Sequence, residues 1–455
     1  MIRKLITRIF SRKASSASRP PALIPVSIHG ITRERVSNAS RRICESLQDA
    51  GFHAFIVGGA VRDLLIGQAP KDYDVATDAT PEEVRRLFRR SRIIGRRFRI
   101  VHVMQGAETV EVSTFRSRHD EDAPTDEHGR VLCDNIFGSQ EEDAARRDFT
   151  VNALYYDPAT ENIVDYHHGV ADLKQKTLRV IGEPRVRYRE DPVRMLRAVR
   201  LAAKLGLVID PAARRPIRDM ADLIENVPGA RLFDEMIKLL TSGHALKCLH
   251  ELRDAGLHTG LLPVLDAILD DPGGARFITL ALENTDRRVR EGKPVSPGFL
   301  FAALLWGQVL RQWERTRAVH PENPDWPPPK PIPALFMAME QVLDAQAEKL
   351  AITRRIAGDI KELWALQPRF ESRSGQKPYA LLTQPRFKAA YDFLLLRAEA
   401  EEIPSELAHW WNDFLDADGP ARAEMLLPAQ GKKRRRRGGG KKRGASPASD
   451  GAAQG

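Results

Sequence analysis

The chain has 455 residues, a hydrophobic content of 42% and a formal net charge of +10. This length and composition support a folded body with more than one domain, and no apolar run reaches the length of a membrane span. The three cysteines form no CxxC pattern, which argues against a zinc site and for a reducing compartment. We therefore expect a globular, cytoplasmic protein.

The positive charge is concentrated at the two ends of the chain. Residues 432–443 hold nine basic residues and residues 1–20 hold six, with no acidic residue in either segment, so the body between them is mildly acidic. Basic arms of this kind suit nucleic acid or an anionic membrane surface. The C-terminal residues expected to bind nucleic acid are Lys432, Lys433, Arg434, Arg435, Arg436 and Arg437.

The N-terminal arm, MIRKLITRIFSRK, lacks the uninterrupted apolar core of a secretory signal. Apolar side chains lie at helical spacing against its basic face: Ile2, Leu5, Ile6, Ile9 and Phe10. A short amphipathic helix that touches a membrane surface or RNA is one interpretation. A disordered basic leader and an organelle transit peptide are the alternatives.

Residues 55–75 predict a strand, a glycine turn, a short helix and a second strand. The apolar run at residues 55–57 is typical of a buried strand, and Gly58 and Gly59 interrupt it. Glycines before a helix N-terminus leave backbone N–H groups free and let a phosphate approach the main chain. Arg62, one turn into the helix, could hold the same phosphate with two donors.

The second strand of this unit, KDYDVAT at residues 71–77, carries two aspartates. Because side chains alternate along a strand, Asp72 and Asp74 are expected on one face. Two carboxylates about 7 Å apart can hold two divalent ions about 3.5–4 Å apart, an arrangement used in phosphoryl transfer. An isolated Gly-Gly is usually only a turn and an isolated Asp-x-Asp only a solvated face, but their combination in one unit favours a functional site.

A hairpin is expected next, with strands over residues 96–104 and 109–115. The returning strand places Glu111 on the face opposite Val110 and Val112. A third carboxylate on a neighbouring strand is what a two-metal site requires. The alternative is that Glu111 is an ordinary cross-strand partner at the surface.

These segments resemble a known family. GGAVRDLLIG at residues 58–67, followed by KDYDVATDATPEEV at residues 71–84, is similar to the head of the class II nucleotidyltransferases, which comprise bacterial poly(A) polymerases and tRNA CCA-adding enzymes. The overall resemblance favours the poly(A) polymerases. It implies template-independent transfer of AMP from ATP to RNA 3′ ends, with two Mg²⁺ ions held by Asp72 and Asp74 and with an acidic residue at the position of Glu111.

RRDFTVNAL, residues 146–154, resembles the family's second motif, which contacts the incoming nucleotide and its ribose. The resemblance implies that Arg147 binds the triphosphate and that Asp148 and Asn152 lie near the sugar or the metal. Asp148 therefore competes with Glu111 as the third catalytic acid, and spacing does not separate them. The alternative is an Arg-Asp ion pair that ties this segment to the sheet.

EDPVRMLRAVR, residues 190–200, resembles the family motif that recognises the base by hydrogen bonds. Drawn as one helix, it gathers Glu190, Asp191, Arg194 and Arg197 on one stripe opposite a buried apolar stripe. The resemblance implies that Asp191 and Arg194 select the adenine of ATP, with Arg197 beside them. The alternative is a surface face in which Glu190 and Arg194 pair at i, i+4.

The expected fold class is α+β, with an N-terminal nucleotidyltransferase-type mixed β-sheet and its helices followed by an all-α C-terminal half. From residue 211 the pattern is helical, and the proline-rich residues 321–333 mark a boundary. We expect a basic leader and linker, a catalytic head, a helical nucleotide-recognition body, a C-terminal helical RNA-binding domain and a disordered basic tail, at residues 1–30, 31–182, 183–322, 334–430 and 431–455.

Two other functions remain open. A tRNA CCA-adding enzyme would share the head motifs, although recognition of one tRNA shape requires no basic tail. A non-catalytic RNA-binding protein on a transferase fold would have no use for the acidic group. We expect a monomer, and partners among RNA-degradation enzymes or RNA chaperones remain possible.

Overall fold

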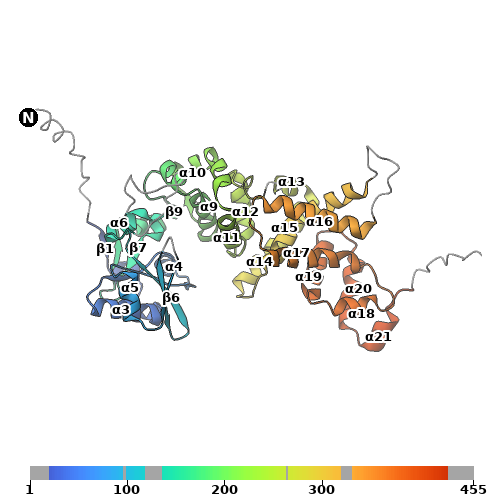
Figure 1. The fold of residues 1–455 in the computed structure, drawn as a ribbon, viewed down its shortest axis with the longest axis horizontal. Helices are drawn as coiled ribbons and strands as arrows, with labels where there is room; N and C mark the ends of the chain where they lie inside the picture. The colour runs from blue at the N-terminus through green and yellow to red at the C-terminus, as the bar shows by residue number, and fades with distance from the viewer. Residues whose placement is uncertain (1–19, 96–98, 118–135, 263–264, 319–329, 429–455) are drawn as a thin grey trace, which may run out of the picture.

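The computed structural model describes residues 20–95, 99–117, 136–262, 265–318 and 330–428 (Figure 1). The predicted nucleic-acid-binding residues 432–437 and the N-terminal arm up to residue 19 lie outside these ranges. Figure 1 shows a sheet with its helices at one end of the molecule and a long helical half that extends away from it. The predicted α+β class is therefore confirmed. In the part of the chain that is described, no helix is both long and apolar enough to cross a lipid bilayer.

The head is built on one eight-stranded sheet in the order β1-β8-β7-β2-β3-β6-β5-β4. Its strands are β1 (Ala22–Ile24), β2 (Ala54–Val57), β3 (Asp74–Thr77), β4 (Ser91–Ile94), β5 (Ile100–Gln105), β6 (Glu108–Thr114), β7 (Leu154–Tyr156) and β8 (Ile163–Asp165). β3 and β6 are parallel, whereas the other neighbouring strands are antiparallel. The sheet is therefore mixed, and its one parallel pair lies at the centre of the candidate site.

Short helices connect and cover these strands. They are α2 (Val26–His29), α3 (Asn38–Asp49), α4 (Gly59–Leu65), α5 (Pro81–Leu87), α6 (Gln140–Arg146) and α7 (Gly169–Lys174), with 3₁₀-helices η1 (Arg33–Arg35) and η2 (Thr150–Asn152). α5 begins as its sequence indicates: Thr80 accepts a hydrogen bond from the Glu83 N–H while the Glu83 side chain accepts one from Thr80 N–H. The buried side of α3 packs with the sheet in one apolar core.

The second half is helical apart from β10 (Val208–Ile209), which pairs in parallel with β9 (Thr177–Leu178). Its helices are α8 (Pro184–Glu190), α9 (Val193–Leu205), α10 (Pro211–Asp219), η3 (Ala221–Asn226), α11 (Gly229–Leu240), α12 (Ala245–Asp254), α13 (Leu265–Leu269), α14 (Pro272–Arg290), α15 (Pro297–Arg317), α16 (Pro331–Ala347), α17 (Arg354–Leu366), η4 (Gln367–Arg369), α18 (Lys377–Leu382), α19 (Phe387–Glu399), α20 (Ser405–Asp416) and α21 (Gly419–Glu424).

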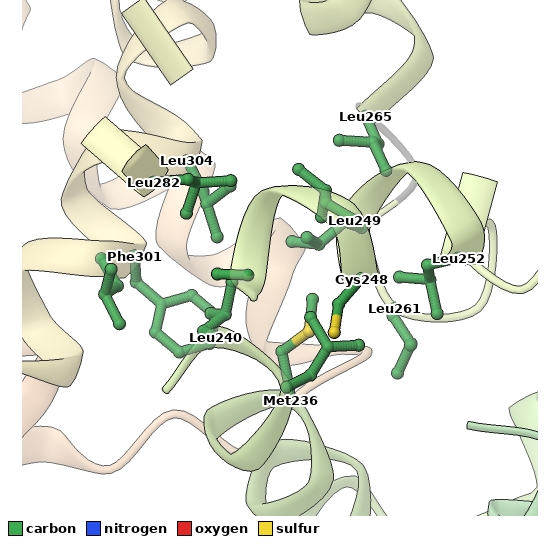
Figure 2. Packing of buried hydrophobic residues seen from close by; sticks show 14 of the residues in the cluster. Met236, Leu240, Cys248, Leu249, Leu252, Leu261, Leu265, Leu282, Phe301 and Leu304 are labelled. Carbon is green, nitrogen blue, oxygen red and sulfur yellow. The ribbon is translucent and has the colours of Figure 1, made fainter. Parts of the chain in front are cut away.

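One hydrophobic core joins the helices of this half, from Val193 in α9 to Phe414 in α20. Figure 2 shows the part in which Met236, Cys248 and Phe301 from three different helices pack together. The same core includes Phe149, which belongs to the head motif. The helical half therefore packs directly against the segment that carries the second nucleotide motif.

Two sequence expectations near the site are wrong in detail. Residues 190–200 do not form one helix, because Pro192 has no N–H to donate and lies between the end of α8 and the start of α9. Glu190 and Asp191 therefore do not share a helical stripe with Arg194. The second strand starts at Asp74, so Asp72 precedes it and its direction is not set by strand alternation.

Candidate active site

The glycine turn between β2 and α4 lets two arginines approach the main chain. Gly58 has φ 78°, in the left-handed region that favours glycine, and its N–H donates to Leu154 O at 3.1 Å. A Cβ at Gly58 would lie 3.4 Å from Arg147 Nη1, and one at Gly59 would lie 3.5 Å from Arg62 Nη2. The turn therefore brings positive charge close to open backbone, as a phosphate site requires.

The acidic part of the site lies where β3 and β6 run in parallel. Asp74 is directly opposite Glu111 in the strand register, and neighbouring strands are about 4.8 Å apart. Burial, followed by the charges of Glu111 and Asp72, raises the pKa of Asp74 to about 6, while Arg147 acts in the opposite direction. Although the Asp74 side chain reaches solvent, its carboxylate is thus surrounded closely enough to feel both its acidic neighbours and one cation.

A divalent cation fits this acidic group. Among the described residues, no set of three or more His, Cys, Asp or Glu side chains is arranged to hold a metal by itself. Mg²⁺ commonly takes only one or two protein carboxylates and completes its coordination with water and substrate phosphates. Because Glu111 and Asp72 raise the pKa of Asp74, a cation at this position would relieve their repulsion.

Asp148 is engaged by a different set of groups. One of its oxygens accepts hydrogen bonds from Arg197 Nε at 2.8 Å and Nη2 at 2.6 Å, and the other accepts one from Asn152 Nδ2 at 3.0 Å. Burial alone would raise the pKa of Asp148, but Arg197 and Asn152 hold it at about 2. Of the two candidates for the third acid, the one placed beside Asp74 is Glu111, which also lies 3.2 Å from His102.

Arg62 is buried and is held by protein groups. Its guanidinium donates to Asp63 Oδ1 at 2.8 and 2.6 Å and to Asn152 Oδ1 at 2.5 Å. Asn152 in turn donates to Asp148, which accepts from Arg197 of α9. A chain of polar contacts therefore runs from the glycine turn to the helical half. The ion pair of Asp148 ties its segment to α9, and not to the sheet as in the alternative considered from the sequence.

Arg147 is the cation that acts on the pKa of Asp74, and it also lies beside the glycine turn. It donates from Nε and Nη2 to Asp143 Oδ2 at 3.2 and 3.0 Å, and from Nε to Tyr155 Oη at 3.0 Å. Tyr155 Oη donates to the same Asp143 oxygen at 2.8 Å. Desolvation would lower the pKa of Arg147, but Tyr155 and Asp143 raise it above its ordinary range, so the side chain carries a fixed positive charge.

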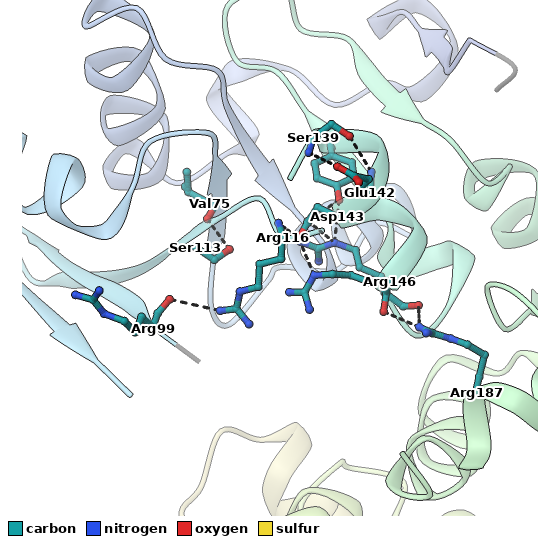
Figure 3. Close-up of polar contacts among 11 residues, drawn as sticks. Val75, Arg99, Ser113, Arg116, Ser139, Glu142, Asp143, Arg146 and Arg187 are labelled. Carbon is teal, nitrogen blue, oxygen red and sulfur yellow. Dashed lines mark hydrogen bonds and ion pairs between the residues drawn. The ribbon is translucent and has the colours of Figure 1, made fainter. Parts of the chain in front are cut away.

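Asp143 was not identified from the sequence, although its spacing contained the signal. It lies on α6, three and four residues before Arg146 and Arg147, the spacing at which helical charges pair. Its side chain is only 2% exposed. Figure 3 shows Asp143 between Arg116, whose N–H it accepts at 3.4 Å, and Arg146, which donates at 3.1 Å.

Arg187 is a second residue that sequence reasoning missed. It lies on α8 and donates from Nη2 to the carbonyl oxygens of Arg146 at 2.6 Å and Arg147 at 2.9 Å (Figure 3). These contacts fix the end of α6 against the helical half. No local pattern indicated them, because the partners are about forty residues apart in the sequence.

Asp191 and Arg194 hold different partners. Asp191 accepts from Arg231 Nη2 at 3.0 Å, and Arg194 Nη1 donates to Glu190 at 3.0 Å and to Arg187 O at 2.7 Å. The pairing of Glu190 with Arg194 at i, i+4, which was the alternative to base recognition, is present. Asp191 and Arg194 both lie next to α8, the helix from which Arg187 donates to the end of α6 in the head.

Family models match three parts of the chain. Residues 54–179 match the poly A polymerase head domain, residues 206–269 match the probable RNA and SrmB-binding site of polymerase A, and residues 329–443 match the polymerase A arginine-rich C-terminus. Together these matches cover both the head and the helical half.

Individual relatives separate the two branches of the superfamily. The poly(A) polymerase I of Salmonella typhimurium is 42% identical over 93% of this chain and 92% of its own length. A CCA-adding enzyme of Lactobacillus helveticus is 37% identical, but over 47% of this chain and 53% of its own length. The solved structure of a Thermotoga maritima CCA-adding enzyme complexed with tRNA has the same fold, with a TM-score of 0.55, 18% identity and coverage of 86% of this chain and 85% of that one.

The likeness to the CCA-adding enzyme thus spans about half of the chain, whereas the likeness to the poly(A) polymerase spans nearly all of it. The geometry of the head site, the helical second half and the family matches all indicate the same family. The chain belongs to the poly(A) polymerase family of nucleotidyltransferases.

Proposed function

We propose that the protein transfers AMP from ATP to RNA 3′ ends without a template. In this reaction the RNA 3′-oxygen forms a bond to the α-phosphorus of ATP, the bond from that phosphorus to the β-phosphate oxygen breaks, and pyrophosphate leaves. The observation that carries the proposal is the acidic pair Asp74 and Glu111 beside the Gly58 turn and Arg147.

Asp72, Asp74 and Glu111 are the residues that would hold Mg²⁺, with two ions proposed. When bound, the metal lowers the pKa of the attacking hydroxyl and neutralises charge on the leaving pyrophosphate. Gly58 lets the triphosphate approach the main chain, and Arg147 supplies a fixed positive charge beside it.

The remaining motif residues position this group. Arg62, Asn152 and Asp148 form the polar chain behind the glycine turn and hold it in register with Arg197 on α9. They thereby keep the triphosphate side of the site fixed relative to the helical half, which reduces the entropy lost when substrate binds.

Asp191 and Arg194 are proposed to select adenine, with Arg197 beside them. A carboxylate and a guanidinium present an acceptor and planar donors, which can pair with one base edge without a template. Arg231 holds Asp191, and Glu190 holds Arg194. ATP would therefore be preferred to CTP because of the donor and acceptor pattern of its base.

RNA and nucleotide are the proposed partners. Cys44 and Cys248 are free and buried. This supports the proposal of a reducing compartment, the cytoplasm.

The test is nucleotide choice. Purified protein is incubated in Mg²⁺ with an unstructured RNA, or with a tRNA that lacks its CCA end, and with each nucleoside triphosphate in turn. The proposal predicts AMP addition to the unstructured RNA and little use of CTP on either substrate. CTP addition to the tRNA would instead assign a CCA-adding activity, and RNA binding with no product would assign a non-catalytic binding protein.

A further inference from the structure

A polar cleft lies between α15 and α16. Figure 1 shows these two helices within the helical half, away from the sheet of the head. Its volume is about 320 Å³, near the lower end of the range of small-ligand sites, about 300–1,000 Å³. It therefore admits a short piece of a chain and is too small for a folded partner. The lining residues are Gln308, Arg311, Gln312, Arg315, Gln341, Val342 and Ala345.

The α15 wall of this cleft is one polar stripe. Gln308 lies three and four residues before Arg311 and Gln312, and Arg315 lies four and three residues after them, so all four share one face of the helix. This contrasts with the first half of α15, where the buried face is apolar. Polar side chains of this kind usually face open solvent, but here they face α16 across the cleft.

The two walls are held in a defined arrangement. Gln312 Nε2 donates to Gln341 Oε1 at 2.7 Å, which joins α15 to α16 across the cleft. Val342 belongs to the large apolar core and is 7% exposed, so it forms an apolar floor beneath the polar side chains. The cleft is therefore a built feature of the helix pair, with fixed amide groups above an apolar surface.

The lining residues of the cleft carry positive charge that no acidic lining residue compensates. None of the lining residues is acidic. Among the described residues, neither Arg311 nor Arg315 forms an ion pair with a carboxylate, whereas Glu340 of the adjacent α16 is taken by Lys361 at 2.6 Å. Two guanidinium groups in one cleft repel each other, and an anionic ligand would offset that repulsion.

We propose that the α15–α16 cleft is a second contact for single-stranded RNA, at a distance from the catalytic head. The inference deepens the proposed function, since it assigns where the RNA chain is held once it leaves the site of AMP addition. Arg311 and Arg315 bind backbone phosphates by two donors each, and the glutamine amides pair with whichever base edges come within reach.

An extended polynucleotide fits these features better than a protein segment. Guanidinium groups suit phosphate geometry, and the cleft presents donors along a line that a strand can follow. Phosphate contacts carry no sequence information. A contact of this type would accept any 3′ end and would still hold a tail whose sequence is uniform.

The test is RNA binding by the Arg311→Gln, Arg315→Gln double variant as a function of salt. Two lost phosphate contacts on a single strand should reduce the slope of log Kd against log salt concentration by about 1.4. They should weaken binding of a long unstructured RNA about 10- to 30-fold near 0.1 M salt. Both side chains reach solvent, so the substitutions should leave the fold intact, and circular dichroism checks this.

The matched control is Arg85→Gln, Arg86→Gln. These arginines are exposed in the last turn of α5 in the head, outside the cleft lining, and the substitutions remove the same charge. The control should keep a slope close to that of the wild type. Equal loss in both double variants, or no loss in the cleft variant, would overturn the proposal in favour of a general charge effect or a different ligand.

A second measurement uses primer length. In steady-state AMP addition, the cleft variant should lose more kcat/KM on a long RNA than on a very short primer that occupies only the head. An equal loss on both primers would overturn the proposal of a distal contact. The binding slopes require no catalysis, so they decide the cleft even if wild-type protein added no AMP to any RNA, a result that would contradict the proposed function alone.

Discussion

Asp74 and Asp148 are aspartates of the same head, but their surroundings act in opposite directions on their charge. Burial, Glu111 and Asp72 raise the pKa of Asp74 to about 6, against the influence of Arg147. Burial would also raise the pKa of Asp148, yet Arg197 and Asn152 hold it at about 2. A cation would offset the charges around Asp74, whereas the charge of Asp148 is already offset by donors of the protein.

The largest expected effect comes from Asp74→Asn. Loss of a metal-holding carboxylate should reduce kcat for AMP addition by about 10³-fold or more, because several kcal/mol of transition-state stabilisation are removed. Primer extension in Mg²⁺ measures this. The control is Asp78→Asn, which lies at the far end of the same strand, where Asp78 pairs with His53; it should keep activity within about twofold, in line with the small contribution of surface pairs.

Glu111→Gln tests which acid is the third member of the group. If Glu111 shares the cation with Asp74, kcat should fall about 10- to 100-fold, because one charge is lost while the hydrogen-bonding shape is kept. The requirement for Mg²⁺ should also move to higher concentration, which a magnesium titration measures. An activity equal to that of the wild type would remove Glu111 from the site and return the role to Asp148.

Asp148→Asn should act mainly on stability. The substitution removes the carboxylate that accepts two hydrogen bonds from Arg197 and leaves Glu235, 3.7 Å away, as the remaining charged partner. The free energy of unfolding should therefore fall by about 2 kcal/mol. Urea unfolding measures the loss. A double-mutant cycle with Arg197→Gln should give a coupling of about 1–2 kcal/mol, and additive losses would argue against the pair as a framework contact.

The pH dependence of stability separates the two aspartates by sign. The folded-state pKa of Asp148 (about 2) lies below its ordinary value of 3.8, so its stabilisation is complete above about pH 4 and is lost as the pH falls towards 2. The pKa of Asp74 (about 6) lies above 3.8, so in metal-free protein its ionisation lowers stability as the pH rises from about 4 to 6.

Urea unfolding in a chelator, measured from pH 3 to 7, tests this difference. Asp74→Asn should be more stable than the wild type near pH 7 and equal to it near pH 4. Asp148→Asn should be less stable near pH 7, with a deficit that shrinks towards pH 3. A change of the same sign in the free energy of unfolding of both variants near pH 7 would contradict the opposite surroundings described for the two aspartates.

The smallest effect is expected from Gly58→Ala. Gly58 has φ 78° and ψ −129°, so a Cβ there costs about 1–3 kcal/mol in backbone strain, and it also meets Arg147 Nη1 at 3.4 Å. Gly67→Ala is the matched control, because Gly67 has φ 76° but nothing within 4 Å of an added Cβ. Both variants should lose stability by thermal unfolding, and only Gly58→Ala should also raise KM for ATP. Equal KM values for ATP in the two variants would argue against contact between Arg147 and the triphosphate.

Local patterns were sufficient to predict the strand-turn-helix unit, because its signals, glycine positions and an apolar run, lie within a few residues of each other. The spacing of Thr80 and Glu83 contains the signal for the α5 capping box. The proximity of the Asp74 and Glu111 strands was instead implied by the resemblance to the nucleotidyltransferases. The break at Pro192 was also visible in the sequence, but a strong helical period on both sides concealed it.

The framework of the site could not be predicted in the same way. Arg62 is held by Asn152, ninety residues away, and Asp148 by Arg197, forty-nine residues away. Such partners are determined by how the head packs against the helical half, which no local period encodes. Residues that look like free ligands in a motif can therefore be structural, and only the packed fold distinguishes them.

The most direct test of the account is a comparison of ATP and CTP use on an unstructured RNA by wild-type protein and Asp74→Asn in Mg²⁺. The account predicts that the wild type uses ATP to add AMP and does not use CTP. The variant should bind the same RNA but add almost no AMP. Undiminished AMP addition by the variant, or a preference of the wild type for CTP, would contradict it.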